Sequence, residues 1–387
     1  MTLAETLLHL CKTTLGALRR ELTTQPSKAR MTFGTEAMLS VALAVALAHA
    51  LHLSDTWWAA ISGFAVMQTS FSGSVQRATH RMIGTLIGAA LGTLIGPWIG
   101  DRPWLFVPTL GATGGVAIYY ANGSRAGYAW VLGGVTALMV TYEAHALMSF
   151  RATAVFAALR VAEVAVGTLA CLLVASAFHF APMGYRKILP TSGSATSAAA
   201  AASSASLPSP SSQTLRPIRR LLGLQGALAI VVLAALTYIL HLPGFAQAMV
   251  TAIAVLILPP GLAADRTHQP IMEKMVQRFA GCLLAGAIGV ALLPLMQGQA
   301  ILCTLALCLG VWVGCHVQTG REGAGYVGRQ FTIAFIMVFV QDHRWSADPQ
   351  PALLRLSGIL TGIVVLAVAM FATSRLHAPH TTNEANR

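Results

Sequence analysis

The chain has 387 residues, of which 55% are apolar and 10% are charged, and its formal net charge is +12. Soluble globular proteins carry about 25% charged residues, so this composition excludes an ordinary soluble domain. The positive charge does not indicate nucleic-acid binding, because the basic residues stand in short clusters between long apolar segments, as they do in membrane proteins. We therefore expect an all-α polytopic membrane protein that binds no nucleic acid.

The N-terminal segment, residues 1–35, lacks the basic start and uninterrupted apolar core of a cleavable signal peptide. It predicts an amphipathic helix instead, because apolar residues recur at three- and four-residue steps with basic residues between them. The leucines of this pattern are Leu3, Leu7, Leu15, Leu18 and Leu22. Two placements are open: on the inner leaflet of the membrane, or packed on the cytoplasmic face of the protein itself.

Twelve apolar segments follow in two groups of six, and most approach the ~20 residues that a helix needs to cross a bilayer. The first group comprises residues 36–53, 56–72, 82–99, 104–121, 126–142 and 153–180. The second group comprises residues 221–241, 244–260, 279–296, 299–316, 325–341 and 352–374. The second segment of each group is short, so a broken or re-entrant helix is open there.

The basic residues indicate the orientation of these twelve segments. On this count nearly all arginines and lysines outside the segments face one side of the membrane, and only Arg102, Arg151 and Arg344 face the other. Basic residues concentrate on the cytoplasmic side of membrane proteins. Both termini are therefore expected in the cytoplasm.

The domain organisation follows from the two groups. We expect a first six-helix repeat over 36–180, a second over 221–374 and a cytoplasmic tail over 375–387. The intervening residues, 181–220, are rich in Ser, Ala and Pro, and they predict a flexible cytoplasmic linker without a packed core.

One sequence motif occurs twice. "RMIGTLIGAALGTLIGP" begins at Arg81, "RFAGCLLAGAIGVALLP" begins at Arg278, and both place the arginine, small residues and proline at the same spacings. Each half has six segments, so both halves enter from the same side and form a parallel repeat, which predicts a site or pathway where they meet. The small-residue faces predict close helix packing. The arginines either anchor the inner side or attract an anionic substrate at a helix N-terminus.

Ionisable residues within the segments are functional candidates, because they are costly in a membrane. Arg160 and Glu163 are three residues apart and share a helix face. They form either a structural ion pair or a functional one, in which Glu163 takes a coupling proton and Arg160 holds a carboxylate. Arg355 is the second-half counterpart of Arg160, but Gly358 stands where Glu163 would be.

Two further polar residues are candidates for substrate binding. Arg329 either lines the pathway or extends to the inner interface. Gln68 either hydrogen-bonds substrate or bonds a neighbouring helix. We expect no metal site, cofactor or catalytic residue: the sequence has no P-loop, H-E-x-x-H or G-x-S-x-G motif, and its six cysteines have no zinc-like spacing.

Three motifs resemble the fusaric acid resistance (FUSC) family: "WWAAISGFAVMQ" (57–68), "Q-R-x-x-x-R-x-x-G-x-x-x-G" (76–88) and "RVAEVAVG" (160–167). The resemblance implies a bacterial inner-membrane exporter of small organic, chiefly aromatic, carboxylic acids, with the bilayer and the acid as partners. Larger members carry a soluble region between the halves, where this chain has only the linker. Without a nucleotide site, export would be driven by protons or by the substrate's own gradient.

Two other functions remain open. The family is similar to the plant aluminium-activated malate transporters, which implies an organic-anion channel as an alternative. The other alternative is a membrane scaffold that transports nothing. A periplasmic adaptor protein is a partner that the resemblance suggests, and the sequence leaves open a homo-oligomer.

Overall fold

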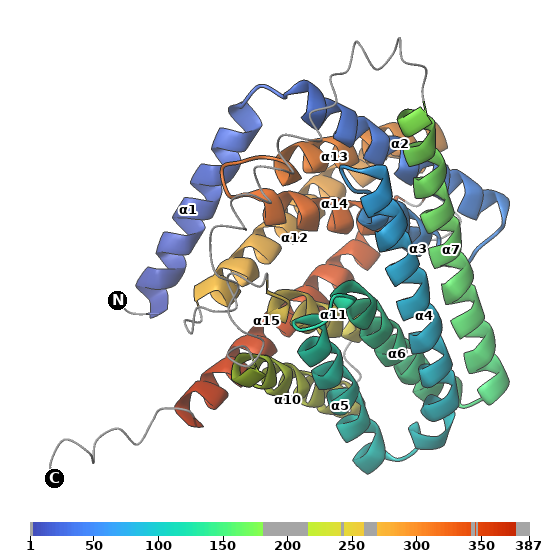
Figure 1. The fold of residues 1–387 in the computed structure, drawn as a ribbon, viewed down its shortest axis with the longest axis vertical. Coiled ribbons are helices and arrows are strands. Elements are labelled where there is room, and N and C mark those ends of the chain that lie inside the picture. Colours follow the sequence, from blue (N-terminus) through green and yellow to red (C-terminus); the bar gives the residue numbers. More distant parts are fainter. Residues whose placement is uncertain are drawn as a thin grey trace, which may run out of the picture.

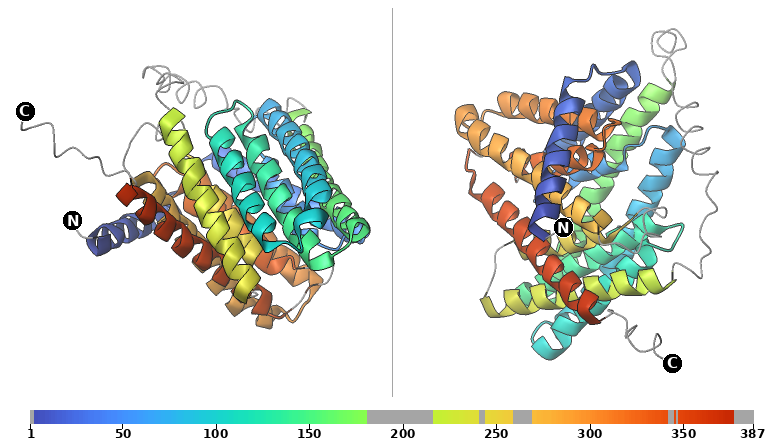
Figure 2. Two further views of the ribbon diagram at one scale, coloured as in Figure 1. Left: turned by 90° about the horizontal axis from the view of Figure 1, so that it is seen from below. Right: turned by 90° about the vertical axis from the view of Figure 1, so that its left-hand side faces the viewer.

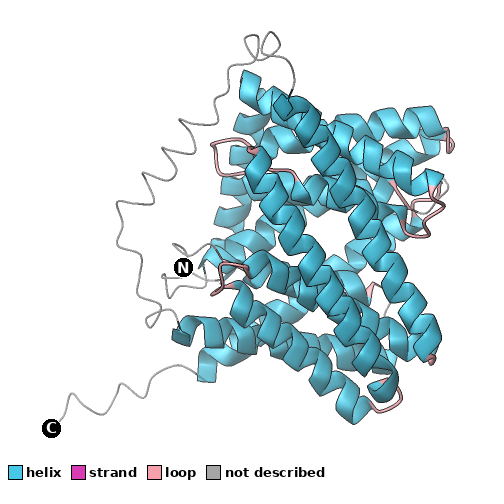
Figure 3. Ribbon diagram, turned by 45° about the vertical axis from the view of Figure 1, so that its right-hand side comes forward, coloured by secondary structure: helices cyan, strands magenta, loops and turns pink. Residues whose placement is uncertain are grey.

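The computed structural model describes residues 3–180, 216–240, 244–258, 269–341, 345 and 347–376. Within these ranges the regular elements are all helices (Figure 1, Figure 3). The helices before the linker are α1 (Leu3–Thr23), α2 (Lys28–Ala50), α3 (Thr56–Val66), α4 (Phe71–Ile99), α5 (Pro103–Ala121), α6 (Gly127–Leu147) and α7 (Phe150–Phe180). Those after it are α10 (Arg216–Leu240), α11 (Phe245–Leu256), α12 (Gln269–Met296), α13 (Ala300–Gln318), α14 (Gly325–Phe339) and α15 (Gln350–Leu376). We refer to α2–α7 as the first half and to α10–α15 as the second half.

Seven of these helices are long and apolar enough to cross a membrane: α2, α4, α7, α10, α12, α13 and α15. As the sequence predicts, the described part of the chain is all-helical, and its long apolar helices are those of a multi-pass membrane protein. Helices α3 and α11 have 11 and 12 residues. At 1.5 Å per residue they cover roughly half of the ~30 Å hydrocarbon core, so they are short, as expected for the second segment of each group.

The helix boundaries differ from the expected segments in ways that affect the site. Helix α4 begins at Phe71 and α12 at Gln269, about ten residues before the predicted segments. Both helices therefore extend beyond the N-terminal end of their apolar segments. Helix α3 ends at Val66. Gln68 therefore lies in the connection between α3 and α4, where its backbone N–H donates to Ser74 Oγ at 3.0 Å.

The expected linker and tail are described only in part. Residues 181–215 lie outside the described residues, and α10 begins at Arg216 within the last part of the segment expected as linker. Helix α15 continues to Leu376, and residues 377–387 of the expected tail lie outside the described residues.

Small residues let neighbouring helices approach closely, as the repeated motif predicts. Gly84 and Gly88 of α4 face α6 so closely that an added Cβ would contact the backbone of Ala129 and Gly133. In the second half, Gly281 of α12 faces α14 in the same way. Backbone contact of this kind replaces the hydrophobic effect as a source of helix association in lipid. The predicted close packing of the two small-residue faces is confirmed.

The two halves also pack on one another through reciprocal helix pairs. Helix α5 of the first half lies along α10 of the second, and α13 of the second half lies along α2 of the first. Figure 2 shows α10 directly beside α5 in the left-hand view. An added Cβ at Gly115 of α5 would meet Ala227 of α10, and Gly34 of α2 lies against the Trp312 ring of α13. Each half therefore contributes one helix to the packing of the other.

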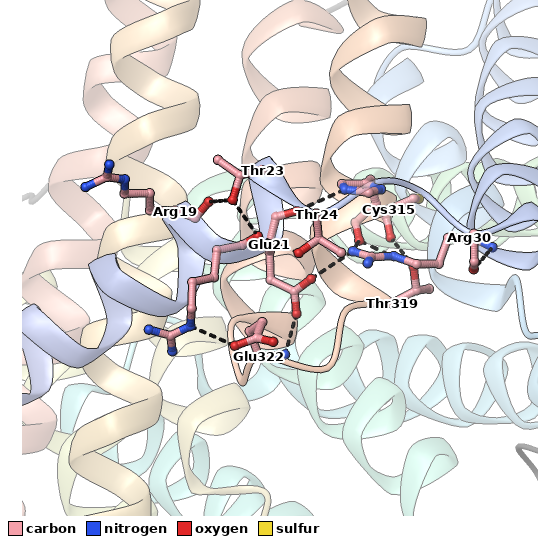
Figure 4. Close-up of polar contacts among 11 residues, drawn as sticks. Arg19, Glu21, Thr23, Thr24, Arg30, Cys315, Thr319 and Glu322 are labelled. Atoms are coloured by element: carbon pink, nitrogen blue, oxygen red, sulfur yellow. Dashed lines mark hydrogen bonds and ion pairs between the residues drawn. The ribbon is translucent and has the colours of Figure 1, made fainter.

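Helix α1 lies against α12 and α13 of the second half (Figure 1). Its C-terminal part is held there by Glu21, whose buried carboxylate pairs with Arg30 at 2.9 Å and accepts the backbone N–H of Glu322 (Figure 4). Arg20 pairs with the Glu322 carboxylate at 2.7 Å. This face of α1 thus packs on the protein itself, as one of the two expected placements requires.

The other face of α1 carries an exposed leucine stripe. Leu8, Leu15 and Leu22 recur at seven-residue spacing and are exposed, whereas Leu10 and Ala17 are buried. Positions two residues apart on a helix lie on nearly opposite sides. The leucine stripe therefore faces away from the protein.

Candidate functional site

A cavity of about 410 Å³ lies between the two halves. Helices α3, α4 and α6 of the first half and α11, α12 and α14 of the second supply most of its wall. The lining is mainly apolar and aromatic, with Trp57, Trp58, Phe64, Tyr128 and Tyr326 among its larger members. Its volume is in the range of small-molecule sites, which are commonly apolar clefts with a few placed polar groups.

The polar part of the lining is strongly positive. Five cationic side chains line the cavity: Arg77 and Arg81 on α4, Lys274 and Arg278 on α12, and Arg329 on α14. Among the described residues, no Asp or Glu belongs to the lining. A cleft with charges of one sign and low-dielectric walls concentrates ligands of the opposite sign, so the cavity is suited to an anion.

The two lining cations of the first half, Arg77 and Arg81, lie next to Ser62 and Tyr128. We call these four residues the first cradle. The buried Arg81 donates from Nε to Ser62 Oγ at 3.1 Å and from Nη1 to Tyr128 Oη at 2.8 Å. The guanidinium of Arg77 lies 4.3 Å from the centre of the Tyr128 ring. Four-residue spacing puts both arginines on one face of α4. Neutral oxygens fix Arg81 and leave its charge uncompensated.

The second cradle has a closely similar construction and comprises Lys274, Arg278, Thr251, Tyr326 and Gln330. The buried Arg278 donates from Nε to Thr251 Oγ1 at 3.2 Å and from Nη1 to Gln330 Oε1. The ammonium of Lys274 lies 5.1 Å from the centre of the Tyr326 ring. Lysine replaces arginine, and an amide replaces the tyrosine hydroxyl as partner of the buried arginine.

Glycines place the hydroxyl partner in each cradle. An added Cβ at Gly167 of α7 would collide with Ala59 O and Ser62 of α3. An added Cβ at Gly362 of α15 would likewise collide with the backbone of Ala248 and with Thr251 of α11. These contacts press the short helices α3 and α11 against α7 and α15, which fixes Ser62 and Thr251 beside the arginines.

A network of ionisable side chains lies behind the tryptophans of the cavity wall. Arg160 pairs with Asp55 at 2.8 Å and with Glu163 at 3.0 Å, so the pair expected from their three-residue spacing forms. Its guanidinium lies 4.7 Å from the centre of the Trp58 ring. Glu163 is fully buried and accepts the backbone N–H of Asp55 at 3.0 Å. The network therefore meets the cavity through an indole ring.

Arg355 approaches the same wall from the second half. Its guanidinium lies 5.0 Å from the centre of the Trp57 ring. The guanidinium of Arg160 lies 5.9 Å from the same ring. Trp57 is thus in contact distance of one arginine from each half.

Some buried polar atoms of the wall lack a partner. Trp58 Nε1, Arg77 Nε and Gln318 Oε1 are buried, and no described residue hydrogen-bonds to them. All three residues line the cavity. Buried donors without partners are rare in folded proteins, so two N–H groups are available here for an acceptor on a ligand.

The candidates from the sequence divide into two sets. Arg81, Arg278, Arg329 and Gln68 line the cavity. Arg160, Glu163 and Arg355 are not among the lining residues. Arg160 and Arg355 contact the tryptophans of the wall, and Glu163 contacts Arg160.

The sequence did not identify several residues of the site as candidates: Arg77, Lys274, Ser62, Thr251, Tyr128, Tyr326 and Gln330. A signal for the first two was present, because each repeated motif has a cation four residues before its arginine, as R-x-x-x-R and K-x-x-x-R. The Gly-Tyr pairs at 127–128 and 325–326 also recur in both halves.

The sequence of the chain matches a known family and a known transporter. The model of the fusaric acid resistance protein family matches residues 30–223, half of the chain, including the first cradle. An uncharacterized transporter, YdhK of Salmonella typhimurium strain LT2, is 26% identical over 162 residues, which are 41% of this chain and 24% of that protein. The match thus spans about a quarter of the relative's length. No solved structure matches the chain. The chain belongs to the fusaric acid resistance protein family.

Proposed function

We propose that the protein is a transporter that moves small organic acids, chiefly aromatic carboxylic acids, out across the bacterial inner membrane. The cavity between the halves carries this proposal, because five cations and several aromatic rings line it and no described carboxylate does. Guanidinium groups bind carboxylates with matched geometry, and aromatic rings stack on an aromatic acid. The transporter designation of the relative in Salmonella typhimurium supports the same class.

The architecture proposed for this transport is twelve membrane helices in two parallel six-helix repeats, with both termini in the cytoplasm. The reciprocal pairs α5–α10 and α13–α2 and the matched cradles support a twofold relation between the halves. In such repeats, substrate is held near the interface while one half rocks against the other. Alternating access of this kind would expose the cradles first to the cytoplasm and then to the outside.

Proton coupling is assigned to Glu163. Its ion pair with Arg160 holds a guanidinium against Trp58, which is part of the cavity wall. Protonation of Glu163 would remove the charge that pairs with Arg160 and would weaken the hold on that guanidinium. A proton at Glu163 would therefore change the wall next to the substrate.

The experiment is efflux of radiolabelled benzoate from proteoliposomes that contain the full chain and carry an imposed pH gradient, with and without an uncoupler. We expect efflux against a benzoate gradient that stops on uncoupling and that falls at least tenfold in Arg81→Gln, because a charge-assisted contact is lost. The matched control is Arg125→Gln, an exposed arginine outside the cavity, which should export at the wild-type rate.

The other outcomes separate the alternatives. An organic-anion channel would pass benzoate only down its gradient, with or without the uncoupler. A scaffold would give no benzoate flux above that of empty liposomes. Equal flux in wild type and Arg81→Gln would contradict the role of the cationic cavity.

A further inference from the structure

The cavity contains two separate cationic groups. Each cradle has a buried arginine held by neutral oxygens and a second cation next to a tyrosine ring. We infer that the two cradles are two carboxylate subsites that are occupied together, by two molecules of a monocarboxylic acid or by the two ends of one dicarboxylic acid. The inference rests on the proposed function and specifies how many acid groups the cavity takes at once.

Charge balance is the first argument for double occupancy. Buried charges in proteins are paired, since an unpaired ion in a low-dielectric site is costly. Arg329 is close enough to Arg77 of the first cradle and to Lys274 of the second for their like charges to repel. One monocarboxylate would neutralise a single cation of the five. A second carboxylate in the other cradle reduces the remaining repulsion.

The second argument is the way in which the buried arginines are held. Ser62 and Tyr128 hold Arg81 through neutral oxygens, and Thr251 and Gln330 hold Arg278 similarly. Neutral partners fix the direction of each guanidinium without cancelling its charge. Each cradle is therefore preorganised for an anion of its own.

The remaining lining suits the carbon skeleton of such acids. Val131 and Leu132 of α6 and Val250 and Ala254 of α11 contribute apolar surface to the same cavity. A dicarboxylic acid with its acid groups at opposite ends of an apolar skeleton matches two cationic groups and apolar walls. An acid with adjacent carboxylates would fill one cradle only.

The test is equilibrium dialysis of the purified full chain in lipid nanodiscs, with radiolabelled benzoate, terephthalate and phthalate as probes. We expect two benzoate molecules per chain but one terephthalate, whose Kd is lower than that of benzoate by about tenfold or more because both ends are bound. Phthalate, with adjacent carboxylates, should bind no tighter than benzoate. These probes distinguish two monoacids from one diacid.

The variants assign the subsites. Arg81→Gln and Arg278→Gln should each reduce benzoate binding from two molecules to one and remove the advantage of terephthalate. Arg77→Gln and Lys274→Gln provide a second pair of variants should the buried arginines be needed for folding, with the same expected result. Arg125→Gln should bind as wild type.

Two results would overturn the inference. Binding of one benzoate per wild-type chain, with terephthalate bound no tighter than benzoate, would contradict double occupancy. If benzoate flux in proteoliposomes were still observed, the proposed function would stand. Absence of both acid binding and acid flux would overturn the two proposals together.

Discussion

Arg81 and Tyr128 are 47 residues apart in the chain, and a 2.8 Å hydrogen bond from Nη1 to the phenol oxygen joins them at the cavity wall. The bond crosses from α4 to α6, the helices brought together by the glycine face of the repeated motif. Arg77 stacks over the same ring. Tyr128 thus contacts both cations of the first cradle. The small-residue face of α4 brings α6 close enough for this contact.

Tyr128→Phe should weaken acid binding without removing a charge. The ring remains beneath Arg77, but Arg81 loses a hydrogen bond and its guanidinium becomes less fixed. A bond to a charged group contributes about 1.5–3 kcal/mol, so the benzoate concentration for half-maximal efflux should rise about tenfold. Proteoliposome efflux at graded benzoate concentrations measures this.

The control for Tyr128→Phe is Tyr120→Phe, since Tyr120 is exposed and does not line the cavity. It should leave the concentration dependence unchanged. An unchanged value in Tyr128→Phe would contradict the positioning of Arg81 by the Tyr128 hydroxyl.

Gly88→Ala should destabilise the protein, whereas Gly286→Ala should not. An added Cβ at Gly88 of α4 would collide with Gly133 O and the Thr136 side chain of α6, but one at Gly286 of α12 would meet only Leu356 Cδ2 at 3.6 Å. Overpacking typically costs about 1–3 kcal/mol. Thermal unfolding of the detergent-solubilised protein should show a lower Tm for Gly88→Ala alone. Equal Tm values for the two variants would contradict the close packing of α4 on α6.

The sequence predicted much of the fold because each membrane helix requires a long apolar segment, which is visible in the sequence. Each of the twelve expected segments overlaps a helix, and seven of the described helices are long and apolar enough to cross a membrane. Hydropathy could not predict the early starts of α4 and α12, since residues 71–81 and 269–278 are rich in polar residues. Those early turns place Arg77 and Lys274 on helices, one turn before the arginines of the repeated motif.

The site was predicted only in part. Residue spacing in the sequence shows which side chains share a helix face, but not which other helices that face contacts. Three-residue spacing indicated that Arg160 and Glu163 pair. It could not indicate that Asp55, 105 residues away, completes the network, or that Trp57 and Trp58 stand between this network and the cavity. Such relations depend on how α3 packs on α7, which no local pattern contains.

Neutralising Glu21 should release α1 from α2 and from the second half. The Glu21 carboxylate is buried and holds both Arg30 and the backbone of Glu322. Loss of one partner of a buried pair typically costs about 3–5 kcal/mol. Glu21→Gln should therefore make α1 more accessible to trypsin, which cleaves after Lys12, Arg19 and Arg20, as followed by mass spectrometry.

A double-mutant cycle provides the control for this release. If the pair is the cause, Glu21→Gln and Arg30→Gln combined should cost less than the sum of the single variants. Strictly additive effects would mean that the two residues stabilise α1 independently.

Glu163→Gln should uncouple benzoate export from the proton gradient while leaving the acid cavity intact. The amide keeps the size of the carboxylate but can neither take up a proton nor pair as an anion with Arg160. With an imposed pH gradient and no benzoate gradient, wild-type proteoliposomes should accumulate benzoate and the variant should only equilibrate it. The matched control is Glu36→Gln on α2, a carboxyl that does not line the cavity and forms no salt bridge among the described residues. Accumulation by Glu163→Gln at the wild-type level, or its loss in Glu36→Gln instead, would move the proton site away from Glu163.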